Sequence, residues 1–85
     1  MLVEAPSNSA PAKRSVTIRG HRTSISLEAE FWDALQDIAT ERKCSVSGLI
    51  AEIDAMRAQP QTASGLSGAV RVYILAWFRE RAAST

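Results

Sequence analysis

The sequence contains a single cysteine and a single histidine among its 85 residues, and this limits its chemistry. One cysteine cannot form an intramolecular disulfide, and chains without disulfides are typical of the reducing cytosol. One histidine and one cysteine cannot fill a four-ligand zinc site, so we expect no metal and no other cofactor. The longest apolar run lies within VYILAWF, far short of the roughly 20 residues of a membrane span. The N-terminal segment lacks a signal-peptide core, so we expect a cytoplasmic protein with no membrane association.

Motifs of the common enzyme classes are also missing. A lone histidine cannot supply a pair of metal-binding histidines, and no glycine-rich phosphate loop is present. The segment GLSGA (65–69) is one residue away from a G-x-S-x-G nucleophile elbow and does not follow a strand. We therefore predict that the protein is not an enzyme.

Acidic residues are absent between residues 5 and 27, where the sequence carries Lys13, Arg14, Arg19 and Arg22. Residues 28–54 have the opposite balance, with seven acids against Arg42 and Lys43. The formal net charge of +1 hides this separation. The charge pattern therefore predicts a basic segment followed by an acidic helix.

Two short segments, SVTI (15–18) and RTSISL (22–27), alternate between apolar and polar residues as strands do. Their apolar residues share one face if the chain turns back between them. We predict a hairpin with a type II′ turn at Gly20–His21, with Ile18 opposite Thr23 and Val16 opposite Ile25. A bulge at Gly20 would also reset the alternation.

Helical spacing follows directly. Acids crowd the first turns of a helix predicted over residues 28–42, where they favour the positive end of the helix dipole. Ser45 or Ser47 is a suitable N-cap for a second helix, which Pro60 would end. The third helix, apolar nearly all round, should be buried on several sides. The predicted organisation is a flexible tail (1–14), a domain (15–58), a linker (59–64) and a C-terminal apolar helix (65–85).

A chain this small is marginally stable alone, and strand 22–27 has few places to pair. Pairing with the same strand of a second chain across a two-fold axis solves both problems. Arg22, Ser24 and Ser26 would then point outward beside their symmetry mates. The predicted dimer core consists of Ile25, Leu27, Phe31, Trp32, Leu35, Leu49 and Ile53.

The stretch RTSISLEAEFWDALQDIATERKCSVSGLIAEI resembles a ribbon-helix-helix domain of the MetJ/Arc/CopG superfamily. The resemblance covers Arg22 to about Met56. The longer run from KRSVTIRGHRTSISLE resembles a subgroup of small bacterial ribbon-helix-helix proteins that are usually presumed to bind DNA. It implies a mainly α fold: an intertwined homodimer in which one antiparallel strand per chain pairs across the two-fold axis, followed by two helices. Here an extra N-terminal strand and a third C-terminal helix would be added.

The resemblance also implies roles for particular residues. In the superfamily the outward strand residues enter the major groove, which corresponds to Arg22, Ser24 and Ser26. The N-terminus of the second helix holds a phosphate, which corresponds to Ser45, Val46 and Ser47. Cys44 stands where many members have glycine. Further phosphate contacts are expected from Lys13, Arg14, Arg19 and His21.

These assignments predict a sequence-specific, DNA-binding transcriptional regulator, and by analogy a repressor. Its partners would be double-stranded DNA and a second copy of the chain, with a dimer of dimers on DNA. An antitoxin would carry a disordered tail, whereas residues 65–85 read as a folded helix. The hairpin raises an alternative, since a four-stranded sheet at about 4.8 Å per strand is wider than a groove of about 12 Å. In that case the dimer would be a platform that binds a protein or small-molecule partner.

Overall fold

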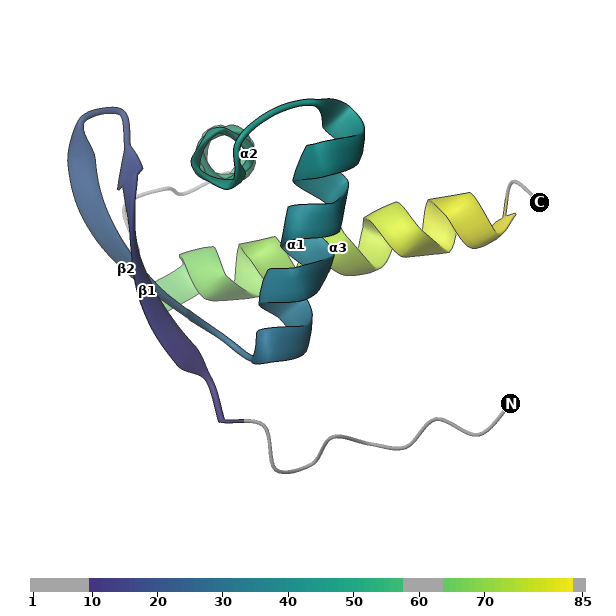
Figure 1. The fold of residues 1–85 in the computed structure, drawn as a ribbon, viewed down its shortest axis with the longest axis horizontal. Coiled ribbons are helices and arrows are strands. Elements are labelled where there is room, and N and C mark those ends of the chain that lie inside the picture. Colours follow the sequence, from purple (N-terminus) through teal and green to yellow (C-terminus); the bar gives the residue numbers. More distant parts are fainter. Residues whose placement is uncertain (1–9, 58–63, 84–85) are drawn as a thin grey trace.

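The chain forms a two-stranded sheet that lies against three helices (Figure 1). The structure, a computed structural model, describes residues 10–57 and 64–83. Their order is β1 (Ala12–Ile18), β2 (His21–Leu27), α1 (Ala29–Arg42), α2 (Val46–Ala55) and α3 (Ser64–Ala83). This confirms the predicted ribbon-helix-helix order, the extra N-terminal strand and the third helix. The predicted tail up to residue 9 and most of the predicted linker, Pro60 included, lie outside the described residues.

The hairpin turns at Arg19 and Gly20, which both have positive φ, 52° and 81°. Two central residues with positive φ define a type I′ turn, whose twist matches that of the flanking strands. Ile18 and His21 close the turn as opposite residues. The predicted turn at Gly20–His21, with Ile18 opposite Thr23, is therefore wrong, although the predicted hairpin is present.

The register of the two strands differs accordingly from the prediction. Val16 lies opposite Thr23 rather than opposite Ile25. The predicted turn would have made Arg19 and Arg22 direct cross-strand neighbours, and like charges in such a pair destabilise a sheet. In the observed register Arg19 moves into the turn, so the two positive charges are no longer paired.

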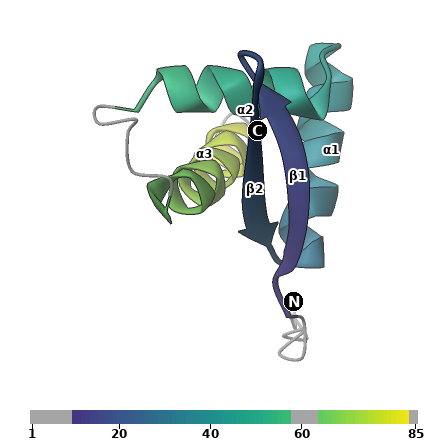
Figure 2. The same ribbon diagram turned by 90° about the vertical axis from the view of Figure 1, so that its left-hand side faces the viewer.

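One side of the hairpin packs against the helices (Figure 2). Residues directly opposite each other share a face, so the apolar residues of both strands point the same way. Ile18, Ile25 and Leu27 are buried there. α2 packs against β1, while α1 and α3 pack against β2. The helices contribute the remaining buried core: Trp32, Leu35, Ile38, Ala39, Leu49, Ile50, Ile53, Leu66, Val70 and Ile74.

The turn between α1 and α2 is fixed by a left-handed residue and a helix cap. Lys43 has φ 59°, and the amides of Lys43 and Cys44 donate to carbonyls of the last turn of α1. Ser45 begins the next helix, and its Oγ accepts a hydrogen bond of 2.9 Å from the Gly48 amide. This confirms Ser45, one of the two candidates, as the N-cap of α2.

The third helix is buried on one side only, which corrects the expectation of burial on several sides. Leu66, Val70 and Ile74 are buried, but Val72 and Leu75 are 66% and 57% exposed. α3 contacts α1, α2 and β2 on the buried side. The remaining elements lie on that side of the helix, so the described chain leaves the opposite face of α3 uncovered.

Candidate nucleic-acid interface

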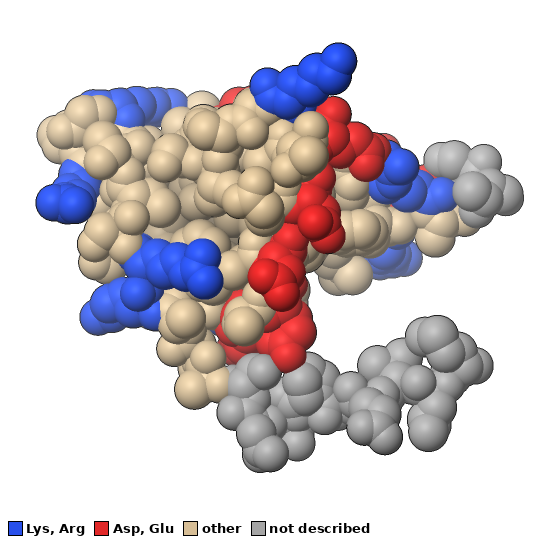
Figure 3. Space-filling view, in the orientation of Figure 1, with Lys and Arg blue, Asp and Glu red and all other residues tan. Residues whose placement is uncertain are grey.

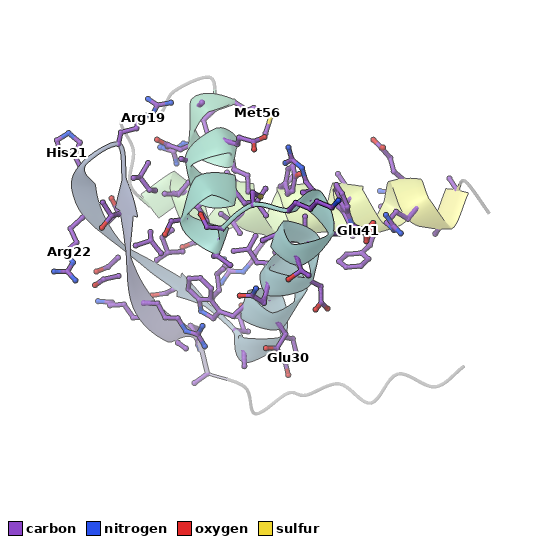
Figure 4. The ribbon with its side chains drawn as sticks, turned by 45° about the horizontal axis from the view of Figure 1, so that its top comes forward. Arg19, His21, Arg22, Glu30, Glu41 and Met56 are labelled. Carbon is purple, nitrogen blue, oxygen red and sulfur yellow. The ribbon has the colours of Figure 1, made fainter. Side chains whose placement is uncertain are left out.

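The side of the hairpin that faces away from the helices is polar and carries no carboxylate. We call it the outer face. In Figure 4 the Arg22 side chain extends from β2 away from the helices. Arg22 and Ser24 are exposed, and Ser26 is half-buried. The alternation of the two strands places these residues on the outer face: Lys13, Ser15, Thr17, Arg22, Ser24 and Ser26.

The edge of β2 that faces away from β1 carries backbone N–H and C=O groups that the two-stranded sheet does not use. Because Ile18 and His21 close a two-residue turn, they form a hydrogen-bonded pair, and the pairs then alternate along the ladder. The backbone groups of Arg22, Ser24 and Ser26 therefore point outward, away from β1. The Ser26 carbonyl accepts a 3.4 Å contact from Arg71 Nη2. At Arg22 and Ser24 no strand among the described residues pairs with this edge, so a further strand could bind there.

Charge is separated between the sheet and α1 (Figure 3). Segment 12–27 contains four cations and no acid. The exposed side of α1 carries Glu30, Asp33, Asp37 and Glu41, three to four residues apart, so they form one acidic strip along the helix. Figure 4 shows Glu30 and Glu41 on the side of the molecule away from Arg22. A polyanion would be attracted to the hairpin and repelled by α1.

The other predicted cations do not all share the outer face. Lys13 does, and Arg19 lies at the exposed turn. Arg14 and His21 lie on the helix-facing side of the ladder, although both are exposed. The Arg14 guanidinium is 4.8 Å from the centroid of the Trp32 ring, a cation–π arrangement. The structure therefore brings Lys13, but not Arg14 or His21, to the same face as Arg22.

The N-terminus of α2 offers backbone donors next to the β1 side of the sheet. The Ser45 hydroxyl already accepts from the Gly48 amide, so it serves as a helix cap. Free amides at a helix N-terminus attract anions, and Val46 and Ser47 occupy the first turn. A Cβ added at Gly48 would lie 3.1 Å from Ser45 Oγ, so a larger residue here would need the Ser45 hydroxyl to shift by a few tenths of an ångström.

The residues predicted for a dimer core are largely buried within one chain. Phe31 is half-buried, and the others are at most 4% exposed: Ile25, Leu27, Trp32, Leu35, Leu49 and Ile53. Their burial therefore does not require a second chain.

Two arginines that sequence reasoning missed connect the elements around the sheet. Arg71 of α3 forms a 3.0 Å ion pair with Glu28, the residue that joins β2 to α1. Arg42 of α1 binds Glu52 of α2 at 3.0 Å and the Tyr73 hydroxyl of α3 at 3.1 Å. A single arginine within an otherwise apolar helical segment, as at Arg71, is the one sequence signal that could have indicated an ion pair with another element.

Within residues 10–57 and 64–83, no group of three or more His, Cys, Asp or Glu side chains is placed to hold a metal ion. In the same part of the chain, no helix is both long and apolar enough to cross a membrane.

Comparison with known proteins identifies the family. The model of the ribbon-helix-helix domain family matches residues 11–78, which include both strands, α1, α2 and most of α3. No curated protein and no solved structure matches the chain. Domains of this family are typically DNA-binding regulators. Since the match spans most of the 85 residues, the chain belongs to the ribbon-helix-helix domain family.

Proposed function

We propose that this protein is a sequence-specific DNA-binding regulator that reads the major groove with the outer face of its hairpin. The observation that carries the proposal is the outer face itself, which is polar, free of carboxylates and exposed except at the half-buried Ser26, on a ribbon-helix-helix domain. A β-ribbon fits the major groove. Arg22 can bind guanine O6 and N7 in bidentate fashion, while Ser24 and Ser26 can donate to or accept from base edges.

The open edge of β2 supports a dimer. Its backbone groups can pair with the β2 strand of a second chain across a two-fold axis, for example with Ser24 opposite the partner's Ser24. The outer faces of both chains then form one surface that matches a palindromic site. The pair Arg22 and the partner's Ser26 would lie side by side at each end of the central ribbon.

Such a dimer has four strands, β1 and β2 of each chain, and three spacings of about 4.8 Å exceed a groove of about 12 Å. We propose that only the two central β2 strands enter the groove. The twist of the sheet turns the outer strands away, so β1 lies along the DNA backbone. Lys13 and the amides of Val46 and Ser47 are then placed to hold phosphates.

Bound at a promoter, a small dimer that fills the groove would compete with the transcription machinery for DNA. We therefore infer that the regulator acts as a repressor.

The decisive experiment replaces Arg22. Arg22→Ala should weaken binding to the selected site by about 1–3 kcal/mol and relax the preference at one base pair per half-site. Selection of bound fragments from random DNA, followed by titration in a mobility-shift assay, measures both effects. Equal loss on all sequences would mean that Arg22 contacts phosphate and does not read a base.

Lys13 and Arg14 provide a matched pair, because they are adjacent cations on opposite faces of β1. Lys13→Ala should weaken binding to all sequences alike and reduce the slope of log affinity against log salt by about one. Arg14→Ala should leave that slope closer to the wild-type value. A larger effect at Arg14 than at Lys13 would contradict the proposed orientation on DNA.

The observed hairpin also favours a second candidate function. If β1 does not lie along the backbone, the four-stranded sheet is too wide for the groove, and the dimer is a platform for a protein or small-molecule partner. Wild-type protein that binds no selected duplex better than random DNA at low salt would favour this platform over the regulator.

A further inference from the structure

The side chain of Arg71, on α3, holds the end of β2. Its Nη2 donates to the Ser26 carbonyl at 3.4 Å, and Nη2 and Nε both donate to Glu28 Oε1, at 3.0 and 3.2 Å. The Arg71 guanidinium also lies 5.7 Å from the centroid of the Phe31 ring, in the first turn of α1. One side chain of α3 therefore links the end of the strand, the junction that follows it and the start of the next helix.

The backbone of Ser26 is not bonded to β1. Lys13 lies opposite Ser26 in a pair that exchanges no hydrogen bonds, so the Ser26 carbonyl points away from β1. Two residues later, the Glu28 carbonyl accepts hydrogen bonds from the first amides of α1, those of Phe31 and Trp32. Among the described residues, Arg71 supplies the hydrogen bond that the Ser26 carbonyl does not receive from the ladder.

Ser26 is a residue for which the position of the backbone matters. Serine is short, so its hydroxyl follows the backbone closely, whereas the long side chain of Arg22 can adjust through several torsions. Groups that recognise a ligand must be held within about 0.5 Å of the productive geometry, usually by a supporting layer of hydrogen bonds. Base reading by Ser26 therefore depends on how the end of β2 is held.

We propose that Arg71 is a positioning residue for base reading by Ser26, so that α3 contributes to sequence discrimination without touching DNA. This inference rests on the proposed reading of the major groove by the outer face. The charge of Arg71 is matched by Glu28 in a 3.0 Å ion pair, and α3 lies on the side of the hairpin opposite to the outer face (Figure 2). A carbonyl has two lone pairs, so the bond from Arg71 leaves one for a second strand at the β2 edge.

Arg71→Gln isolates the contact with Ser26. The amide nitrogen of glutamine stands where arginine has Nε, so it can still donate to Glu28, but nothing replaces Nη2 at the Ser26 carbonyl. Arg42→Gln is the matched control. Arg42 has a 3.0 Å ion pair with Glu52 and a similar side-chain exposure, 33% against 35% for Arg71. Its hydrogen bonds, however, connect helices and do not reach β2.

The measurement is the ratio of dissociation constants for the selected site and for sites with one base pair changed, from mobility-shift titration. Ser26→Ala first identifies the base pair whose preference depends on the Ser26 hydroxyl. Arg71→Gln should reduce the discrimination at that same base pair by about fivefold or more, which is what one well-read base pair typically supplies. In the Ser26→Ala background Arg71→Gln should have little further effect, because Arg71 acts through Ser26. Arg42→Gln should leave the discrimination unchanged.

Several results would overturn the role of Arg71. Additive effects of Arg71→Gln and Ser26→Ala, or a Ser26→Ala variant with unchanged preferences, would show that Arg71 does not act through Ser26. A salt slope reduced by about one in Arg71→Gln would mean that Arg71 binds phosphate directly. An equal loss of discrimination in Arg42→Gln would assign the effect to helix docking in general.

Failure of this inference is distinguishable from failure of the proposed function. Wild-type protein without any sequence preference would refute both. Wild-type protein that discriminates, with Arg71→Gln discriminating equally well, would refute only the role of Arg71. Circular dichroism establishes that each variant is folded. If Arg71→Gln is not folded, Arg71→Met takes its place, because its apolar stem keeps the packing against Phe31 while both hydrogen bonds are lost.

Discussion

Lys43 ends α1 in the left-handed region, with φ 59° and ψ 44°, a conformation that favours glycine. The family resemblance assigned the usual glycine position to Cys44, but the left-handed backbone is one residue earlier. Lys43→Gly should therefore relieve strain and stabilise the protein by up to about 1 kcal/mol, less the entropy that glycine adds to the unfolded chain. Urea unfolding measures the change. Lys43→Ala removes the charge but keeps the strain, so it should give no such gain, and equal stability of the two variants would contradict the explanation.

Glu28 connects β2 to α1 and provides a pH-dependent contribution to stability. A hydrogen bond from its own backbone amide lowers the pKa of the Glu28 carboxyl, and the hydrogen bond from Arg71 lowers it further. A carboxyl whose pKa is lower in the folded state stabilises the fold at pH values above its ordinary pKa of 4.5. This contribution is lost as the pH falls through the pKa of the folded state.

Glu28→Gln should therefore weaken the fold near neutral pH and make its stability less sensitive to acid below about pH 4.5. Thermal unfolding between pH 7 and pH 3 tests this, with Asp33→Asn on exposed α1 as the control. The prediction would be wrong if the loss of stability in acid were unchanged in Glu28→Gln and reduced in Asp33→Asn. Asp33, and not Glu28, would then be the carboxyl responsible.

At the scale of the element, the start of α2 serves two purposes that mutations can separate. Ser45 caps the helix through its hydrogen bond to Gly48, and replacement by alanine should cost about 1 kcal/mol. Ser45→Asp keeps a capping acceptor, so the stability should be largely retained. Its negative charge, however, would repel a phosphate held by the amides of Val46 and Ser47.

The expected result is that the Ser45→Asp variant has a near wild-type melting temperature and clearly weaker DNA binding. Calorimetry and a mobility-shift titration measure the two properties. DNA binding as strong as that of the wild type would contradict a phosphate contact at this helix end.

For the whole molecule, the open β2 edge and the separation of charge between sheet and α1 favour assembly and binding on the hairpin side. Ser24→Pro removes the outward amide at the centre of that edge, while the ladder to β1 does not use this amide. The variant should lose dimerisation through β2 and lose cooperative binding to a palindromic site, yet keep its helical circular dichroism. Sedimentation velocity at several concentrations distinguishes this from unfolding. A dimer of unchanged strength through β2 would exclude the β2 edge as its interface.

Much of the fold was accessible from the sequence, because the signals were local. Alternation over SVTI and RTSISL predicted two strands whose apolar residues share a face, and Ser45 was one of two candidate caps. The separation of Arg22 from the acids of α1 also follows from chain order and helical spacing. These features depend on residues only a few positions apart, where backbone geometry decides which side chains share a face.

The tertiary structure decided features that depend on competition between distant groups. The observed turn places Arg19 in the loop, so that it is not paired with Arg22 across the strands. The side of α3 that is buried is the side against which α1, α2 and β2 pack. Apolar composition alone predicted burial on several sides, but it could not specify that Ile74 would face the core and Leu75 would face solvent. Likewise, Lys13 and Arg14 are neighbouring basic residues that the sequence does not distinguish as phosphate contacts. Only the packing of the hairpin on the helices shows that Lys13 faces outward and Arg14 faces the helices. The sequence therefore determined the elements and their polarity, while packing determined which surfaces remain free to bind.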